Sequence, residues 1–395
     1  MAALTDFFPK LLVLAGLLLA ALTAAPLAQR LRLPGPAAFL AIGIIAGLTG
    51  IAPTKELSPV TLEQIGAVAL YAILFQGGLA TGFRAWRRSA QPILLLGLPG
   101  TAATASSLAV FAHFLLGLDW PLAFLIGIAL APTDPAAVYA VLRGQQGESR
   151  ARTILEGESG FNDPVGISLM VVAVAIVSAD GGSYPEGAVR LVEELGIGLA
   201  GGIVGGVLLI AALRATPHLE EGLQSVAILG GAVLVGAATA TLHGSGFLAV
   251  YLSGLLVADR WAEQDGRHHA VPESIAAAAE PVLFGLLGAS FAPLVGGSDI
   301  AKGLALAVLT AFAVRPIVAA ACLARTGLRP SERVLVSWGG LKGAVPLLLA
   351  AYPALESLDG AETTQAVVLV ATAASIVVQG ATLAFVAGRV PATAP

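Results

Sequence analysis

Apolar stretches of the length that a helix needs to cross a bilayer, about 20 residues, recur along almost the whole chain. Short segments rich in charged residues, proline or glycine separate them. Of the 395 residues only 12% are charged and 57% are hydrophobic, whereas roughly a quarter of the residues of soluble proteins are charged. So few charges cannot cover the surface of a soluble chain. The sequence therefore predicts an all-α polytopic membrane protein that inserts into a lipid bilayer.

The apolar runs predict about thirteen transmembrane helices that form one transmembrane domain over residues 1–395. The charged and Pro/Gly-rich segments between these runs set the expected ends of the spans. The expected spans are roughly 9–28, 35–50, 61–80, 91–116, 120–142, 152–177, 195–213, 222–242, 244–258, 272–293, 299–324, 335–352 and 362–388.

The basic residues test this map independently and orient it. With thirteen spans and an outside N-terminus, fifteen of the twenty-one Lys and Arg residues fall in cytoplasmic loops, four fall outside, and Arg315 and Lys342 remain within spans. Because Lys and Arg are enriched in short cytoplasmic loops, we expect an outside N-terminus and a cytoplasmic C-terminus. The first run, which follows Lys10, has an alternative interpretation as a signal peptide. The charge alternation favours a retained helix.

Ionisable side chains within the spans are expensive to insert and are therefore candidates for function. Acids outnumber bases among them, which favours a cation site over an anion site. The single cysteine, Cys322, excludes a disulfide framework and a cysteine-based metal site, and nothing in the sequence predicts a cofactor or a nucleic-acid partner. The ionisable residues within spans are Asp134, Glu156, Glu158, Asp163, Glu280, Arg315 and Lys342.

The fifth span contains Pro132-Thr133-Asp134-Pro135 in its middle. Each proline removes a backbone donor and clashes with the preceding turn, so the helix should break here. Irregular backbone at membrane depth is tolerated only where it is buried in protein or lines a cavity. Freed carbonyls, the Thr133 hydroxyl and the Asp134 carboxylate would then supply oxygen ligands.

The sixth span contains Glu158-Ser159-Gly160-Phe161-Asn162-Asp163. Helical spacing stacks Glu158 with Asn162 and Ser159 with Asp163, each four residues apart. One face therefore presents a hydroxyl and a carboxylate together. Glu156 lies nearer the cytoplasmic end of this span and is a candidate gate residue or a solvated helix-end residue.

The twelfth span, with Gly339-Gly340-Leu341-Lys342-Gly343 followed by Pro346, shows a second interruption. Paired interrupted spans in the two halves of a transporter point to its substrate site. The fifth and twelfth spans are seven apart, so two six-helix repeats would be inverted, with crossed discontinuous helices. Lys342 is expected to compensate the helix dipoles at the breaks. Arg315 cannot lose its proton, and Glu158 is its expected partner, with the Asn162 oxygen as a further acceptor.

Five motifs in order carry a family resemblance: Thr133-Asp134-Pro135, Glu158 to Pro164, Gly244 to Tyr251, Ala313-Val314-Arg315-Pro316 and Gly340 to Pro346. They resemble the first monovalent cation:proton antiporter family, the NhaP-type exchangers, and most of all its bacterial potassium/proton branch. The resemblance implies thirteen helices, a homodimer in the bacterial cytoplasmic membrane, and exchange of Na⁺, K⁺ or Li⁺ for protons in pH homeostasis. By the family pattern Asp163 binds a cation or a proton in turn, while Asp134, Ser159 and the Thr133 carbonyl help to coordinate the ion.

The resemblance also implies that the Asn162–Asp163 pair marks electroneutral exchange. Three features depart from the family pattern. Lys342 stands where Arg is usual, Gln76 stands where an acid is common, and no cytoplasmic domain of the potassium/proton type follows the last expected helix. Gln76 is therefore only a candidate gate or funnel residue. Glu280 is another such candidate, and it has a second interpretation as a partner of Lys342.

The expected mechanism is competition, because a protonated Asp163 is neutral and does not hold a cation, whereas an ionised one does. Two functions of other classes use the same residues. A cation channel needs the acids without obligatory proton coupling. An intramembrane serine protease would use Ser159 in Gly157-Glu158-Ser159-Gly160, but it needs a histidine base. Only His113 and His243 are expected near the membrane, His243 at the end of a span, and the acids around Ser159 would not assist acyl transfer. We therefore expect a transporter and not an enzyme.

Overall fold

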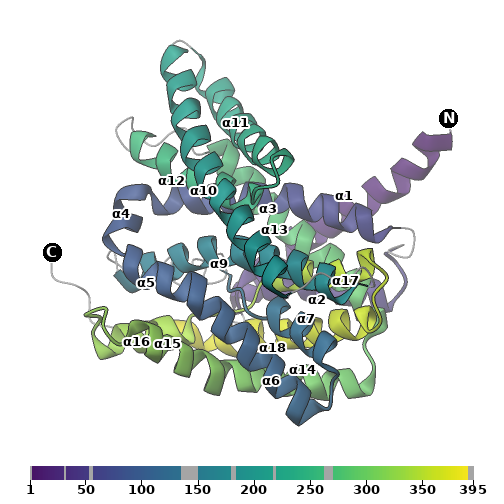
Figure 1. Cartoon of the computed structure of the whole chain (residues 1–395). Coiled ribbons are helices and arrows are strands. Elements are labelled where there is room, and N and C mark those ends of the chain that lie inside the picture. The colour runs from purple at the N-terminus through teal and green to yellow at the C-terminus, as the bar shows by residue number, and fades with distance from the viewer. Residues whose placement is uncertain are drawn as a thin grey trace.

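The computed structural model describes residues 2–30, 33–52, 57–134, 150–178, 184–216, 219–261 and 270–389. Every regular element within these ranges is a helix, which confirms the all-α fold class (Figure 1). Nine helices or continuous runs of helix in the described ranges are long and apolar enough to cross a membrane, and three shorter apolar helices accompany them. The second half of the expected fifth span, 135–142, lies outside the described residues.

The first part of the chain forms helices α1 to α7, which include a π-helical turn, η2. Their bounds are α1 (Ala2–Arg30), α2 (Gly35–Leu48), α3 (Pro59–Thr81), α4 (Phe83–Arg88), α5 (Ala90–Leu95), η2 (Leu96–Gly100), α6 (Thr101–Leu116) and α7 (Trp120–Ala129). Ser58 caps α3 by accepting a hydrogen bond from the Thr61 N–H, and α6 ends at Gly117 in the left-handed conformation that glycine favours.

The later elements begin after the undescribed segment 135–149. Their bounds are α9 (Arg150–Val177), α10 (Tyr184–Ala215), α11 (Glu221–Thr241), α12 (Gly246–Trp261), α13 (Ala270–Phe291), η4 (Ala292–Leu294), α14 (Gly297–Leu309), η5 (Thr310–Val314), α15 (Arg315–Leu323), α16 (Pro330–Trp338), α17 (Ala344–Leu355) and α18 (Ala361–Ala387). Pro316, the second residue of α15, lacks an N–H donor, and the π-helical turn η5 lies immediately before α15.

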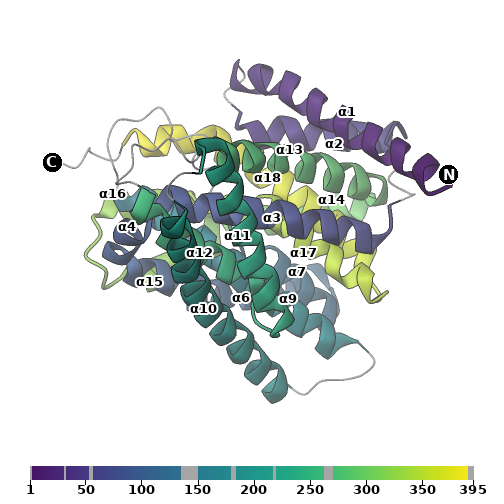
Figure 2. The same cartoon turned by 90° about the horizontal axis from the view of Figure 1, so that it is seen from above.

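One set of helices packs with backbones in direct contact, and we call it the scaffold group: α1, α2, α3, α10, α11, α12 and α13. Gly43 of α2 lies against the backbone of α13, and Gly78 of α3 lies against the backbone of α12. Gly202 of α10 also lies against α12. Figure 2 shows α1, α2 and α13 side by side at one edge. Such glycines let helices approach closely in a membrane.

Apart from the short helix α4, which contacts helices of both sets, the remaining helices form a second set, which we call the site group: α5 to α7, α9 and α14 to α18. Gly127 joins α7 to α6, and Gly303 joins α14 to α18, again by close backbone approach. Helix α9 packs against both groups, with α5, α7, α16 and α17 on one side and α3, α10 and α12 on the other. Most of its middle is fully buried.

Helix α10 begins at Tyr184, whereas the sequence predicted a span that starts near 195. Its first turns carry Glu186, Arg190, Glu193 and Glu194. The sequence analysis interpreted this charged stretch as a loop, because it precedes the apolar run expected to form the span. Glu and Arg are nevertheless good helix formers, and the helix continues through them.

The close approach of α3 and α12 can be tested with two adjacent glycines. A Cβ atom at Gly78 would overlap the backbone of α12, whereas one at Gly77 would meet nothing within 4 Å. We expect Gly78→Ala to lower the free energy of unfolding by about 1–3 kcal/mol through overpacking. Gly77→Ala, which removes a flexible glycine from the same helix, should be neutral or slightly stabilising. Thermal unfolding in detergent measures both, and equal midpoints for the two variants would contradict the packing.

Candidate functional site

The end of α7 and the interruption between α16 and α17 meet at the centre of the site group, and the continuation of the expected fifth span beyond Asp134 lies outside the described residues. Helix α7 ends at Ala129, and the chain continues without helical structure to Asp134. The second interruption, 339–343, separates α16 from α17. The two breaks are joined directly, because the Asp134 N–H donates a hydrogen bond of 2.8 Å to the Leu341 carbonyl oxygen.

Lys342 and Asp134 lie at opposite helix ends within this crossing. The Lys342 ammonium group donates hydrogen bonds of 3.1 Å to the carbonyl oxygens of Ala131 and Pro132, just beyond the C-terminus of α7. Asp134 packs against Gly343, where α17 begins, so closely that a Cβ atom at Gly343 would overlap its carboxylate. A cation at a helix C-terminus and an anion at a helix N-terminus are the favourable arrangement of charge and dipole.

Three polar side chains connect the first break to α9. The Thr133 hydroxyl lies 2.9 Å from the Ser159 hydroxyl, and the Asn162 amide donates a hydrogen bond of 2.9 Å to Thr133 Oγ1. The Thr133 N–H donates in turn to Asn162 Oδ1 at 3.4 Å. All three residues are at most 2% exposed. The sequence placed these residues in one site, and the structure brings them into contact.

Asp163 follows Asn162 on α9 and is 1% exposed. It lies within electrostatic range of both Asp134 and Lys342. Its Oδ1 atom is buried and accepts no hydrogen bond from any described residue. Buried carboxylate oxygens normally have partners, so this acceptor differs from the hydrogen-bonded side chains of Thr133, Ser159 and Asn162 beside it.

The Arg315–Glu158 contact expected from the sequence is present as a bidentate ion pair. Two guanidinium nitrogens donate to the two carboxylate oxygens at 2.5 and 2.7 Å, and both side chains are buried. Gly340 permits this geometry, because a Cβ atom there would collide with the guanidinium group. The further acceptor is the Val336 carbonyl at 3.1 Å. The expectation that it would be the Asn162 oxygen was wrong, because that oxygen accepts from the Thr133 N–H instead.

The candidate gate residues lie around this centre without joining it. Glu156 accepts a hydrogen bond of 2.8 Å from Arg152, one turn earlier on α9. Glu280 lies within electrostatic range of Asp134, and in the described part of the chain it forms no ion pair with Lys342, whose ammonium group bonds to carbonyls. Gln76 is half-buried on α3, and its Oε1 atom has no donor among the described residues.

A polar stripe on α18 supports the second break and was missed in the sequence. Ser375 accepts a hydrogen bond from the Lys342 N–H at 3.0 Å and donates to Gln379 Oε1 at 2.6 Å. Gln379 then donates to the Trp338 carbonyl at 3.1 Å. A sequence pattern could have predicted this stripe, because Thr372, Ser375 and Gln379 recur at helical spacing in a mostly apolar span. All three are buried in the structure.

The donor set around Asp163 consists of hard oxygens: carboxylates, hydroxyls, an amide and freed carbonyls. Such ligands suit alkali and alkaline-earth cations better than softer transition metals. Among the described residues no group of three or more His, Cys, Asp or Glu side chains could hold a metal ion. The arrangement can therefore offer a partly charged oxygen cage to a small cation or accept a proton at the same carboxylate.

Known proteins with similar sequences are transmembrane exchangers. The family model described as sodium/hydrogen exchanger, transmembrane, matches residues 17–388. A K⁺/H⁺ antiporter NhaP2 of Shewanella sp. (strain ANA-3) is 33% identical over 94% of this chain and 65% of its own length. A Na⁺/H⁺ antiporter ApNhaP of Aphanothece halophytica is 26% identical over 83% of this chain and 64% of its own. This chain thus spans just under two thirds of the length of these relatives.

The fold also has a close counterpart among solved structures. The sodium proton antiporter MjNhaP1 of Methanocaldococcus jannaschii superposes with a TM-score of 0.82, over 97% of this chain and 99% of that one, at 22% sequence identity. At this identity the likeness concerns the fold alone. It extends over nearly the whole chain, so the all-helical architecture described above is that of a known exchanger fold.

The Glu158–Arg315 pair yields a stability test. Glu158→Gln leaves a buried guanidinium group without its counter-charge, and we expect a loss of about 3–5 kcal/mol in the free energy of unfolding. Glu156→Gln, two residues away, removes a carboxylate from the more exposed pair with Arg152 and should cost less than about 1 kcal/mol. In a double-mutant cycle Glu158→Gln and Arg315→Gln should be strongly non-additive. Additive effects on the unfolding midpoint would refute the pairing.

Proposed function

We propose that this chain, which belongs to the sodium/hydrogen exchanger family, is a secondary active antiporter that exchanges a monovalent cation for protons across a membrane. The observation that carries the proposal is the buried Asp163 carboxylate. One of its oxygens has no donor among the described residues, and it stands beside the hydroxyl–amide cluster at the crossing of two interrupted helices. A cation or a proton would satisfy that oxygen.

The proposed mechanism is competition for Asp163 coupled to alternating access. The ionised carboxylate, with Asp134, Ser159 and the Thr133 oxygens, holds a dehydrated cation; the protonated carboxylate does not. Lys342 and the Arg315–Glu158 pair hold the crossing together and touch no transported ion. Because one site serves both ions, each passage of the site across the membrane carries either a cation or a proton, and the two fluxes are linked.

Sodium and potassium are both candidate substrates, with lithium as a third. Relatives of this chain are named for K⁺/H⁺ and for Na⁺/H⁺ exchange, and oxygen ligands accept either ion. The neutral Asn162, which stands next to Asp163 and bonds to Thr133, supports electroneutral exchange, because it contributes no second titrating carboxylate at this position.

We further propose that the protein works as a homodimer in a bacterial cytoplasmic membrane, with its N-terminus outside and its C-terminus in the cytoplasm. The excess of basic residues in alternate loops supports this orientation. Figures 1 and 2 also place the start of α1 and the end of α18 at opposite ends of the helix bundle, as an odd number of crossings requires.

The alternative functions receive less support from the geometry. Ser159 bonds to Thr133 rather than to a base, and His113 lies at the end of α6, where it bonds to the Leu118 carbonyl. Among the described residues, no histidine bonds to the Ser159 hydroxyl as the base that a serine protease needs. A cation channel would use the same oxygens, but it would conduct cations without moving protons in return.

Asp163→Asn tests the proposed function. We expect this isosteric change to abolish cation-driven proton flux in proteoliposomes under Na⁺, K⁺ and Li⁺ gradients, because the amide can neither ionise nor bind a proton in exchange. The matched control is Glu362→Gln, the same chemical change on an exposed residue in the first turn of α18, which should leave the flux unchanged. Robust proton flux in the inserted Asp163→Asn protein would sink the assignment. Cation conductance without proton movement in the wild type would identify a channel.

Competition at one carboxylate also makes a kinetic prediction. Lowering the pH on the side from which the cation binds should raise the apparent KM for the cation, because protons occupy the same group. Saturating cation should restore much of the rate. The measurement is the initial rate of exchange against cation concentration at several pH values. A KM that does not change while the maximal rate falls would argue for separate cation and proton sites.

A further inference from the structure

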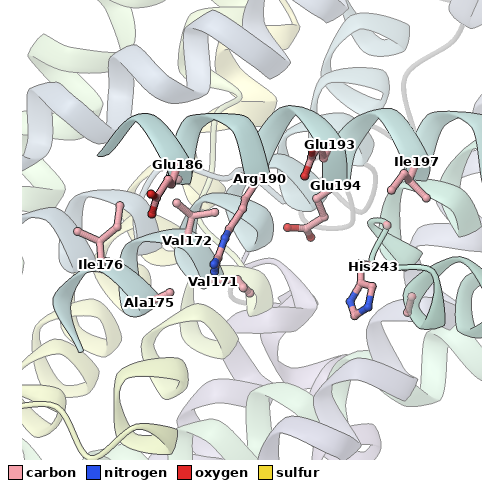
Figure 3. A pocket seen from close by; sticks show the side chains of 13 residues that line it. Val171, Val172, Ala175, Ile176, Glu186, Arg190, Glu193, Glu194, Ile197 and His243 are labelled. Carbon is pink, nitrogen blue, oxygen red and sulfur yellow. The ribbon is translucent and has the colours of Figure 1, made fainter. Parts of the chain in front are cut away.

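A cavity of about 470 Å³ lies between the end of α9, the start of α10 and the turn that joins α11 to α12. Its polar lining comes largely from α10, with His243 contributed by the turn (Figure 3). Three carboxylates and one guanidinium group line it: Glu186, Glu193, Glu194 and Arg190. With the orientation proposed above, the cavity opens at the outer face, and its excess of negative charge favours cations.

Glu194 forms the boundary between this cavity and the interior. Its side chain lines the cavity and also accepts a hydrogen bond of 2.8 Å from the Ser168 hydroxyl on α9. Ser168 is fully buried, and it lies little more than one helical turn beyond Asp163. The α9 residues that line the cavity begin at Val171, in the next turn outward. Along α9, the Ser168–Glu194 hydrogen bond therefore lies between Asp163 and the residues that line the cavity.

The two partners of this bond belong to different helix groups. The Glu194 carbonyl accepts a hydrogen bond of 2.9 Å from the Ser245 N–H, which ties α10 to the start of α12. Further along α10, Gly198 lies against the backbone of Ser245, just before α12, and Gly202 lies against the backbone of α12 itself. Glu194 is thus fixed to the scaffold group, whereas Ser168 is on the helix that carries Asp163.

Elsewhere α9 meets the scaffold group through side chains. The Tyr251 ring of α12 packs on Gly160, and its hydroxyl reaches the Gly157 carbonyl at 3.5 Å. On α17, Tyr352 lies within electrostatic range of both Glu63 and Glu194. Carboxylates from α3 and α10 therefore flank the outer end of the interface between the two groups.

We propose that this cavity is the outer access route to the cation site and that the Ser168–Glu194 hydrogen bond closes it in the present conformation. The inference rests on the proposed antiport and on its orientation. When the site opens outward the bond breaks, and the Glu194 carboxylate is released to attract the incoming monovalent cation. Glu194 is therefore an access residue for the transported ion as well as a partner in the closing bond.

Two variants of the same bond should act in opposite directions on the outer face. Ser168→Ala removes the donor and keeps the Glu194 charge. A single hydrogen bond shifts a two-state equilibrium by roughly two- to tenfold, so the outward-open state gains population and the apparent KM for outer cation falls by about that factor. Glu194→Gln keeps an acceptor oxygen for Ser168 and removes the charge, so the outer KM rises.

The measurement compares exchange in right-side-out and everted membrane vesicles, with Na⁺ and K⁺ as probes. The cytoplasmic KM should not fall in either variant. Glu193→Ala is the matched control, because it removes a neighbouring carboxylate of the same cavity that forms no bond with Ser168. An outer KM of Ser168→Ala that stays at the wild-type value, or that changes equally on both faces, would overturn the closing bond. Ser168→Ala and Glu194→Ala should not be additive.

A labelling readout separates this inference from the proposed function. In a Cys322→Ser background, Val172→Cys places one thiol in the cavity lining. A membrane-impermeant maleimide should label it in intact cells, and labelling only in everted vesicles would overturn the outer location. If the wild type shows no exchange at all, the proposed antiport itself fails. If exchange is intact without the shift in outer KM, only the access route fails.

Discussion

A backbone N–H or C=O group without a hydrogen-bond partner in the hydrocarbon layer costs several kcal/mol. Such groups therefore need partners within the protein, and the crossing of the two helix breaks supplies them. The breaks free carbonyls and N–H groups at membrane depth. The chain satisfies them with each other, through the Asp134 N–H and the Leu341 carbonyl, and with Lys342 and Ser375. Irregular backbone can therefore persist beside α9, and the Thr133 oxygens become available to an ion. The site exists because the cost of breaking two helices is offset within the protein.

The contrast between the two kinds of helix contact gives this site a means of movement. Within the scaffold group, glycines such as Gly78 and Gly254 bring backbones into direct contact, and such contacts tolerate little displacement. Helix α9 meets the same group through the Tyr251 ring and through the Ser168–Glu194 bond. Side-chain contacts and single hydrogen bonds can be exchanged at modest cost. The boundary along α9 is thus where the alternation required by the proposed antiport can take place.

Much of the fold and of the site could be predicted because charge is so scarce in this chain. Residues such as Asp163 and Arg315 stand out in apolar spans, and a guanidinium group that cannot be deprotonated demands a partner such as Glu158. The partners of Lys342 could not be predicted, because they are backbone carbonyls, which a sequence does not distinguish. Asn162 was assigned to the wrong neighbour for a related reason: helical spacing fixes its face but not its rotamer. Glu194 was missed because the first turns of α10 were interpreted as a loop.

The charges of the buried centre have a consequence for the exchange ratio. Arg315 cancels Glu158 within a bidentate pair, and Lys342 offsets one of the two aspartates, Asp134 and Asp163. With Asn162 neutral, a single negative charge remains in the part of the site group that surrounds the ion. Glu280 lies within electrostatic range of Asp134, but it belongs to α13 of the scaffold group, so this sum covers the charges of the site group alone. One monovalent cation or one proton then makes the centre neutral in either loaded state. Because an unbalanced charge is costly at membrane depth, movement of the site across the membrane without a bound ion is disfavoured. This penalty supports the one-for-one, electroneutral exchange proposed above.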